Sequence, residues 1–169
     1  MGSVARDVSA YAHCVVAVVP PALGPVTEGP VVVGVDGSPE SEEAAEFAAR
    51  QARVWHRDLM VVSAADAGAP QAGLMNGSAR DPGQAYARAE RVATDSLEGL
   101  RGLLRGFGGR VEAKAIFGRP AIALAHTARR ASLLVVGARG AGGFAGKLIG
   151  STSRALLEVS DGPVVIVRA

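Results

Sequence analysis

The stretch PVVVGVDGSPE, at residues 30–40, reads as a strand, a tight turn and the first turn of a helix. Its first half is apolar at successive positions, which is typical of a central parallel strand that is buried on both faces. Ser38 is a favourable N-cap, Pro39 suits the first helical position, and Glu40 begins an acidic first turn. The stretch therefore predicts the opening half of a βαβ unit.

The same alternation continues along the rest of the chain. Further runs that we interpret as strands lie at residues 59–64, 111–116, 133–136 and 163–168. Amphipathic stretches that we interpret as helices lie at residues 84–107, 118–131 and 151–160. Strands that alternate with helices predict an α/β fold, an open parallel five-stranded sheet with helices on both faces.

Composition narrows the class of protein. The chain has 169 residues, of which 49% are hydrophobic, so it can bury the core of one domain. No apolar run approaches the length of a membrane span, and the N-terminus does not read as a signal peptide. The single cysteine, Cys14, excludes an internal disulfide framework and fits a reducing compartment. A net charge of +2 and 4% aromatic residues argue against nucleic acid as a partner, so we expect a cytoplasmic protein without a membrane or nucleic-acid partner.

The glycine-rich loop at residues 137–150 is the most informative segment for function. Its glycines allow the backbone to approach a ligand closely and to adopt positive φ. The predicted helix after Gly150 starts with hydroxyl residues and has no acid in its first turn, so its free N–H groups favour a phosphate, and the cationic Arg139 lies in the loop before it. In such sheets ligands bind at the carboxyl ends of strands, which adds Asp36 and Ala64 as candidates. The alternative is a linker with an ordinary serine cap.

The spacing Gly137-x2-Gly140-x9-Gly150-Ser151 resembles the nucleotide-binding signature of the universal stress protein family. The resemblance covers residues 30–169, from the first strand and its turn to the final apolar strand. It implies a Rossmann-like sheet of the adenine-nucleotide-binding type, with strand order 3-2-1-4-5, and it implies ATP binding. The site residues that it implies are Gly34, Val35, Asp36, Ala64, Gly137, Arg139, Gly140, Gly150, Ser151 and Thr152.

The resemblance also implies roles for these residues. Asp36 would lie against the nucleoside, and the backbone of Ala64 would meet the edge of the adenine. The loop glycines would line the ribose and phosphates, while Ser151 and Thr152 would hold the phosphates. Asp36 is also the candidate for an indirect contact to Mg²⁺, which prefers carboxylate and phosphate oxygens. The alternative reading of Asp36 is a turn residue within Asp-Gly-Ser.

No catalytic constellation is evident in the sequence. His13, His56 and His126 do not follow any predicted strand, and no paired carboxylates lie near the glycine-rich loop. We therefore expect an ATP-binding stress-response sensor or signalling module, without a catalytic residue or a metal site of its own, rather than an enzyme. The alternatives are a nucleotide-free dimerisation or interaction module and a slow ATPase.

The N-terminal residues resemble the C-terminal ones. Gly2-Ser3 and Arg6 fall on Gly150-Ser151 and Arg154 at a constant offset of 148 positions, the separation of Gly2 from Gly150. We interpret residues 1–19 as the last helix and strand of a preceding domain, residues 20–29 as a proline-rich linker, and residues 30–169 as a universal stress protein domain. The alternative is an unrelated tail.

The last predicted strand, Val164–Val167, is apolar on both faces although the implied strand order puts it at a sheet edge. An exposed apolar edge is a template for pairing with another strand, so we expect it to be covered. One candidate partner is the same strand of a second molecule, which would give a two-fold symmetric homodimer. The other candidate is the N-terminal tail at residues 15–19, from its own chain or from a neighbouring one. We expect a homodimer, with the tail ordered as an added strand or helix against this edge.

Overall fold

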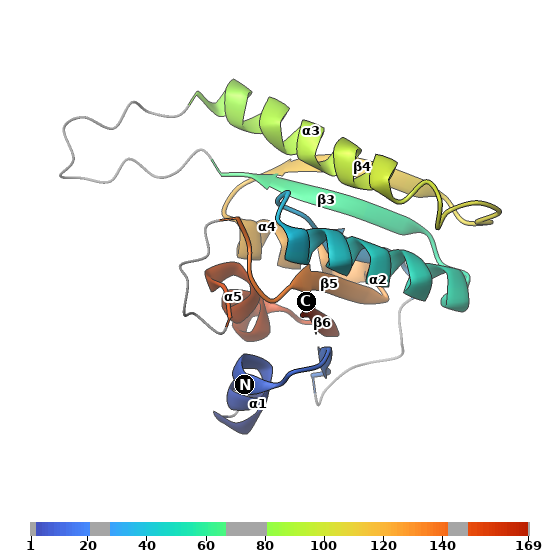
Figure 1. Cartoon of the computed structure of the whole chain (residues 1–169). Coiled ribbons are helices and arrows are strands. Elements are labelled where there is room, and N and C mark those ends of the chain that lie inside the picture. Colours follow the sequence, from blue (N-terminus) through green and yellow to red (C-terminus); the bar gives the residue numbers. More distant parts are fainter. Residues whose placement is uncertain (1–2, 21–27, 67–80, 142–148, 169) are drawn as a thin grey trace.

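The computed structural model describes residues 3–20, 28–66, 81–141 and 149–168, with side chains from residue 7 onward. The strands are β1 (Val16–Val18), β2 (Val31–Gly34), β3 (Leu59–Ala65), β4 (Val111–Phe117), β5 (Leu133–Gly137) and β6 (Val164–Val167). The helices are α1 (Ser3–Tyr11), α2 (Pro39–Trp55), α3 (Pro82–Gly99), α4 (Pro120–Thr127) and α5 (Ser151–Val159), with a 3-10 turn at Ala128–Arg130. Strands and helices alternate along most of the chain, and the helices lie around one mixed sheet (Figure 1).

The sheet has the order β1-β6-β5-β2-β3-β4. The five strands from β2 to β6 are parallel, and counted from β2 they keep the expected order 3-2-1-4-5. The expectation of five strands is wrong by one, because β1 is added as a sixth strand, antiparallel to β6. Its register pairs Val16 with Ile166 and Val18 with Val164, which covers the apolar edge.

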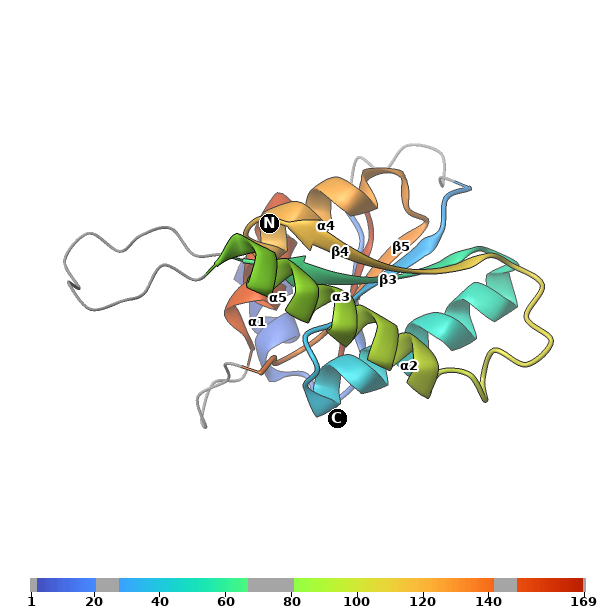
Figure 2. The ribbon, with the colours of Figure 1, turned by 90° about the horizontal axis from the view of Figure 1, so that it is seen from above.

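Helices cover both faces of the sheet (Figure 2). On one face α2 packs closely because the side chains that it buries are small, and α3 lies beside it. These buried alanines of α2 are Ala44, Ala45, Ala48, Ala49 and Ala52. On the other face, α4 packs over β3 and against α5, while α5 packs over β6, and Leu124, Leu156 and Leu157 are buried in the core between these helices and the sheet. Both faces of the central strands are therefore dry, as the apolar stretch at residues 31–33 predicts.

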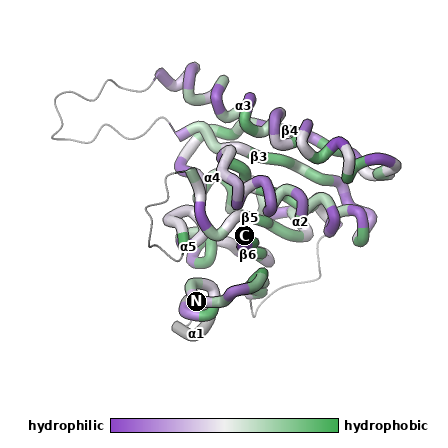
Figure 3. Tube along the Cα trace, viewed as in Figure 1, coloured by the Kyte–Doolittle hydropathy of each residue, from purple (hydrophilic) through white to green (hydrophobic). Residues whose placement is uncertain are grey.

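The two edges of the sheet differ in polarity. In β4 the exposed side chains Glu112 and Lys114 alternate with less exposed ones, so this edge strand has a wetted side as its sequence predicts. In β6 all four residues are buried. In the hydropathy trace the strands of the sheet are mainly green, whereas α2 and α3 alternate between purple and green along their length (Figure 3).

Helix α3 is shorter than the pattern at residues 84–107 predicts. It ends at Gly99, and turns continue through Gly106, which has a φ of 68°. Glycine is a poor helix former, and Gly99 and Gly102 fall within the predicted run, so the helix ends while Leu100 and the apolar residues beyond it still pack on the core. No helix among the described residues combines the length and apolarity needed to cross a membrane.

The N-terminal tail folds onto the domain. When 148 is added to each residue number, α1 has the same bounds as α5, and β1 matches the first three residues of β6. Arg168, just after β6, donates hydrogen bonds from its guanidinium to the carbonyl oxygens of Ser9 and Ala10, at 2.7 and 2.6 Å. These contacts satisfy carbonyls in the last turn of α1. The strand predicted at residues 15–19 is therefore formed, and it pairs within its own chain.

Candidate functional site

A cavity of about 300 Å³ lies at the carboxyl ends of the central strands. All ten residues that the sequence predicts for the site line it, from Gly34 in β2 to Thr152 in α5. The described residues that line it without having been predicted are Ser41, Ser63, Pro120, Leu124, Val136 and Ser153. Its volume is at the lower end of the range for small-molecule sites.

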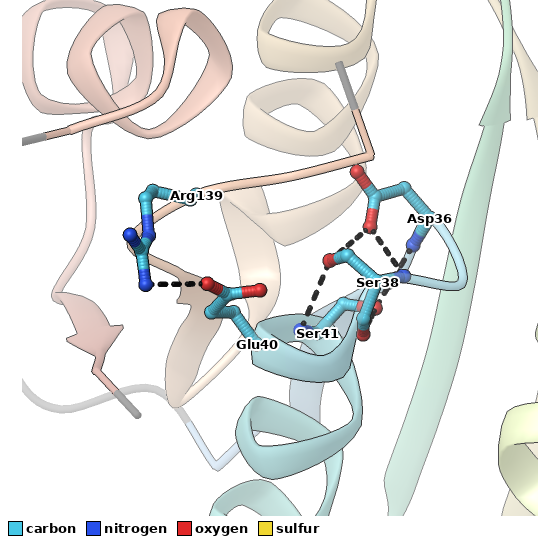
Figure 4. A network of polar contacts seen from close by, with 5 residues as sticks. All are labelled: Asp36, Ser38, Glu40, Ser41 and Arg139. Carbon is cyan, nitrogen blue, oxygen red and sulfur yellow. Dashed lines mark hydrogen bonds and ion pairs between the residues drawn. The ribbon is translucent and has the colours of Figure 1, made fainter. Parts of the chain in front are cut away.

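Asp36 connects the turn after β2 with the loop after β5 (Figure 4). Its Oδ1 accepts hydrogen bonds from the backbone N–H and the hydroxyl of Ser38, at 3.1 and 2.6 Å, while Gly37 takes the positive φ that this turn needs. Its Oδ2 accepts the backbone N–H of Ala141 at 2.8 Å. Asp36 is therefore both a turn residue and a lining residue of the cavity, so the two readings of the sequence are compatible.

At Gly137 and Gly140 a glycine is required because neighbouring atoms leave no room for a Cβ, and not because the backbone adopts a positive φ. A Cβ at position 140 would collide with Oδ2 of Asp36, and one at position 137 would lie 2.8 Å from the carbonyl oxygen of Glu40. The expectation of positive φ is wrong for Gly137 and Gly140, since neither has it, and the other glycines to which it applied, Gly142, Gly143 and Gly146, lie outside the described residues. Gly137 and Gly140 let the loop lie directly on the start of α2.

The start of α5 lacks a side-chain cap. Its N-cap residue is Gly150, and its first turn contains no acid. Ser153 is buried and donates its hydroxyl to the carbonyl oxygen of Gly137 at 2.6 Å, so it fixes the helix to the end of β5. Among the described residues, the hydroxyls of Ser151 and Thr152 have no hydrogen-bond partner. The first turn therefore presents free N–H groups and two free hydroxyls at the cavity.

Arg139 is the cationic residue of the described lining. Its Nη2 forms an ion pair with Oε1 of Glu40, in the first turn of α2, at 2.7 Å (Figure 4). The Arg139 side chain is 50% exposed, whereas that of Glu40 is 16% exposed. The guanidinium is therefore close to the solvent, while its partner is enclosed against the helix.

The remaining titratable candidates lie elsewhere. His56 is the left-handed C-cap of α2, with a φ of 53°, and His126 is in the last turn of α4. Neither belongs to the described lining of the cavity, and within the described part of the chain no group of three His, Cys, Asp or Glu side chains converges in a way that could hold a metal ion. Asp36 is the carboxylate of the described lining.

Sequence reasoning missed the residues that close the back of the cavity. Leu124 reaches across from α4 to Gly34, where a Cβ would lie 2.8 Å from its Cδ1. Ser63 is a buried polar residue in β3, directly before the predicted Ala64. A serine within an otherwise apolar buried strand is a signal that could have drawn attention to it, whereas the contact of Leu124 depends on how α4 packs.

The fold is therefore an open, mostly parallel α/β sheet with a polar cavity at the carboxyl ends of its strands. The model of the universal stress protein family matches residues 29–168, and the chain belongs to that family. The match begins just before β2 and ends just after β6, so it covers the five parallel strands and leaves out α1 and β1.

Among individual proteins, a universal stress protein of Mycobacterium bovis is 35% identical over 99% of this chain and 53% of its own length. The chain spans about half the length of the curated relatives that it matches. A universal stress protein crystallised with cAMP is 28% identical, has a TM-score of 0.57, and aligns with 82% of this chain and 96% of its own. A universal stress protein of Archaeoglobus fulgidus in complex with dAMP is 21% identical, has a TM-score of 0.58, and aligns with 82% and 97% of the two chains.

Proposed function

We propose that the chain binds an adenine nucleotide, ATP, in this cavity and acts as a stress-response signalling module. The observation that carries the proposal is the uncapped start of α5, whose free N–H groups and two free hydroxyls line the same cavity as Arg139. Together they provide hydrogen-bond donors and positive potential for phosphate oxygens. The structurally similar proteins in complex with cAMP and dAMP support the choice of an adenine nucleotide.

The rest of the cavity suits the nucleoside. Apolar atoms of Val35, Ala64 and Leu124 offer a surface for a base, and the backbone of Ala64 can pair with its edge. Asp36, at the carboxyl end of β2, would lie against the ribose. Both of its carboxylate oxygens already accept hydrogen bonds, so a Mg²⁺ ion would enter with the phosphates and contact Asp36 indirectly.

Two other functions remain alternatives. In a nucleotide-free interaction module, the free N–H groups and hydroxyls at the start of α5 would have no ligand to bind. In a slow ATPase the lining would have to position a water molecule, and its described side chains include no histidine and one carboxylate, Asp36, which is already hydrogen-bonded. We expect turnover well below the ~1 per second at the low end of enzymes, and a faster rate that a loop substitution abolishes would make the protein an enzyme.

Calorimetric titration with ATP, AMP, cAMP and adenosine tests the proposal. Mass spectrometry of ligand released from the purified protein accompanies it. We expect ATP to bind more tightly than adenosine, because only ATP reaches the start of α5 with phosphates. A protein that releases no nucleotide and gives no heat with any of the four would be the interaction module instead.

We also propose that α1 and β1 imitate the end of a second domain of the same kind, so that the edge of β6 is an interface with a homologous unit. The match of α1 with α5 and of β1 with β6 at an offset of 148 positions supports this. The antiparallel pairing of β1 and β6 supports it as well, because its central pair, Ala17 and Val165, consists of residues that are equivalent at the same offset. The curated relatives are about twice as long as this chain, as a tandem would be. Where β1 leaves β6 or is exchanged, two copies would form a homodimer through Val164–Val167.

Val16→Asp tests the role of the tail. Val16 is 9% exposed and faces the core, whereas its neighbour Val15 is 40% exposed and serves as the matched control. We expect Val16→Asp to release β1, because a carboxylate cannot remain buried without a partner. Light scattering should then show a changed mass, or thermal melting a lower midpoint, with Val15→Asp unchanged. If Val16→Asp matches Val15→Asp in both measurements, the tail has no such role.

A further inference from the structure

The three acidic residues at the start of α2 have different partners. Glu42 accepts a hydrogen bond from the hydroxyl of Ser96 in α3, at 2.7 Å, so it joins two helices. Glu43 is exposed, and in the described part of the chain its side chain has no partner. Glu40 instead points toward the loop after β5, where it pairs with Arg139 (Figure 4). Of the three, Glu40 is therefore the one that acts on a lining residue of the cavity.

This pairing changes the charge that the cavity presents. Arg139 and Asp36 are the charged residues of its described lining. Glu40 is not part of that lining, but its Oε1 lies 2.7 Å from Nη2 of Arg139. A phosphate at the start of α5 thus meets one positive charge that is already neutralised and a second carboxylate nearby. Because charges in a partly enclosed site are screened less than on an open surface, the carboxylate of Glu40 opposes an incoming anion.

We propose that Glu40 determines how strongly the cavity prefers nucleotides with more phosphates. It acts as a positioning residue: it holds the guanidinium of Arg139 against α2 and offsets its charge, so the nucleotide competes with Glu40 for Arg139. The inference rests on the proposed adenine-nucleotide site. It implies that the affinity for ATP is lower than the donors around the cavity alone would give, while the affinity for adenosine is independent of Glu40.

Glu40→Gln separates the charge from the contact, since glutamine keeps an oxygen that accepts a hydrogen bond from Arg139. We expect the variant to bind ATP about threefold to tenfold more tightly, AMP by a smaller factor, and adenosine equally well, with the gain for ATP shrinking as salt is added. At the same time its melting point should fall slightly, because an acid is lost from the first turn of α2. A purely structural role would not raise affinity while lowering stability.

Two further variants complete the experiment, with titrations of ATP, AMP and adenosine into the full chain. Glu43→Gln makes the same charge change on the same helix without a contact to Arg139, and it should leave all three affinities within about twofold. In Arg139→Gln, adding Glu40→Gln should give a smaller gain than in the wild type, because the competition is gone. Equal or weaker ATP binding by Glu40→Gln, alongside a wild type that binds ATP, overturns this inference alone. If neither the wild type nor Glu40→Gln binds a nucleotide, the proposed function is overturned as well.

Discussion

Two helices, α2 and α5, begin beside the same cavity, and their first turns are built in opposite ways. In α2, the hydroxyl of Ser38 accepts the N–H of Ser41, and the acidic residues Glu40 and Glu42 compensate the positive end of the helix dipole. In α5, the cap position is a glycine, and the first turn contains hydroxyls without an acid. The comparison shows that one helix start is satisfied by its own sequence, whereas the other keeps free N–H groups, which the phosphates of the proposed nucleotide would occupy.

The strongest way to remove this difference is to give α5 an acidic first turn. Ser151 is exposed at the first helical position, so Ser151→Glu should fold normally. We expect its ATP affinity to fall by about a hundredfold, because the new carboxylate would lie beside the phosphates in a partly enclosed site. Its thermal midpoint should stay equal or rise slightly, since the acid favours the helix dipole.

Ser151→Gln is the control, because it adds a side chain of similar size without the charge. Calorimetric titration of both variants gives the result. If the glutamate and glutamine variants bind ATP within about threefold of each other, charge at the start of α5 does not govern binding.

A side chain at the cap of α5 should have the next largest effect. A Cβ at position 150 would lie 3.3 Å from the carbonyl oxygen of Ala138 and 3.5 Å from the Cα of Arg139, so the branched side chain of Gly150→Val would push the start of α5 away from the loop that lines the cavity with it. Each charge-assisted hydrogen bond to phosphate is worth ~1.5–3 kcal/mol, so losing them should weaken ATP binding at least tenfold. Gly162→Val is the matched control, because no atom lies within 4 Å of its Cβ. Unchanged affinity in a folded Gly150→Val protein contradicts the prediction.

The smallest effects should come from removing one hydroxyl from each helix start. Ser38→Ala deletes the cap of α2, and we expect it to lower the free energy of unfolding by about 1 kcal/mol while changing ATP affinity by less than about threefold. Ser151→Ala should do the reverse, with stability unchanged and ATP affinity reduced a few-fold. Chemical denaturation and calorimetry of the two variants give a reciprocal pattern. If both variants lose stability and neither changes its ATP affinity, the two helix starts do not differ in their roles.

Much of the fold and the identity of the lining residues could be predicted from the sequence. The apolar strands and the caps of the helices are local signals, and parallel strands necessarily bring their carboxyl ends together, so Asp36, Ala64 and Gly137 were expected at one edge. The start of α5 was identified in the same way, from its glycines and its lack of acids. These features depend on residues that are near one another in the chain.

The pairings across the cavity could not be predicted. Glu40 and Arg139 are 99 positions apart, and nothing in either segment indicates that one side chain meets the other. Likewise, the three hydroxyls after Gly150 look equivalent in the sequence, yet Ser153 is turned inward and used by the fold while Ser151 and Thr152 are not. Such assignments depend on the packing of helices against the sheet, which sequence patterns do not specify.

The strand β1 also has a consequence for the order in which the protein forms. Val16 and Ile166 are paired although they are 150 positions apart, so their pairing closes the longest loop in the sheet. During synthesis β1 leaves the ribosome early and stays unpaired until β6 follows at the end of the domain. We therefore expect its three residues to complete the sheet last and to be the first to exchange their amide protons when the native protein opens locally.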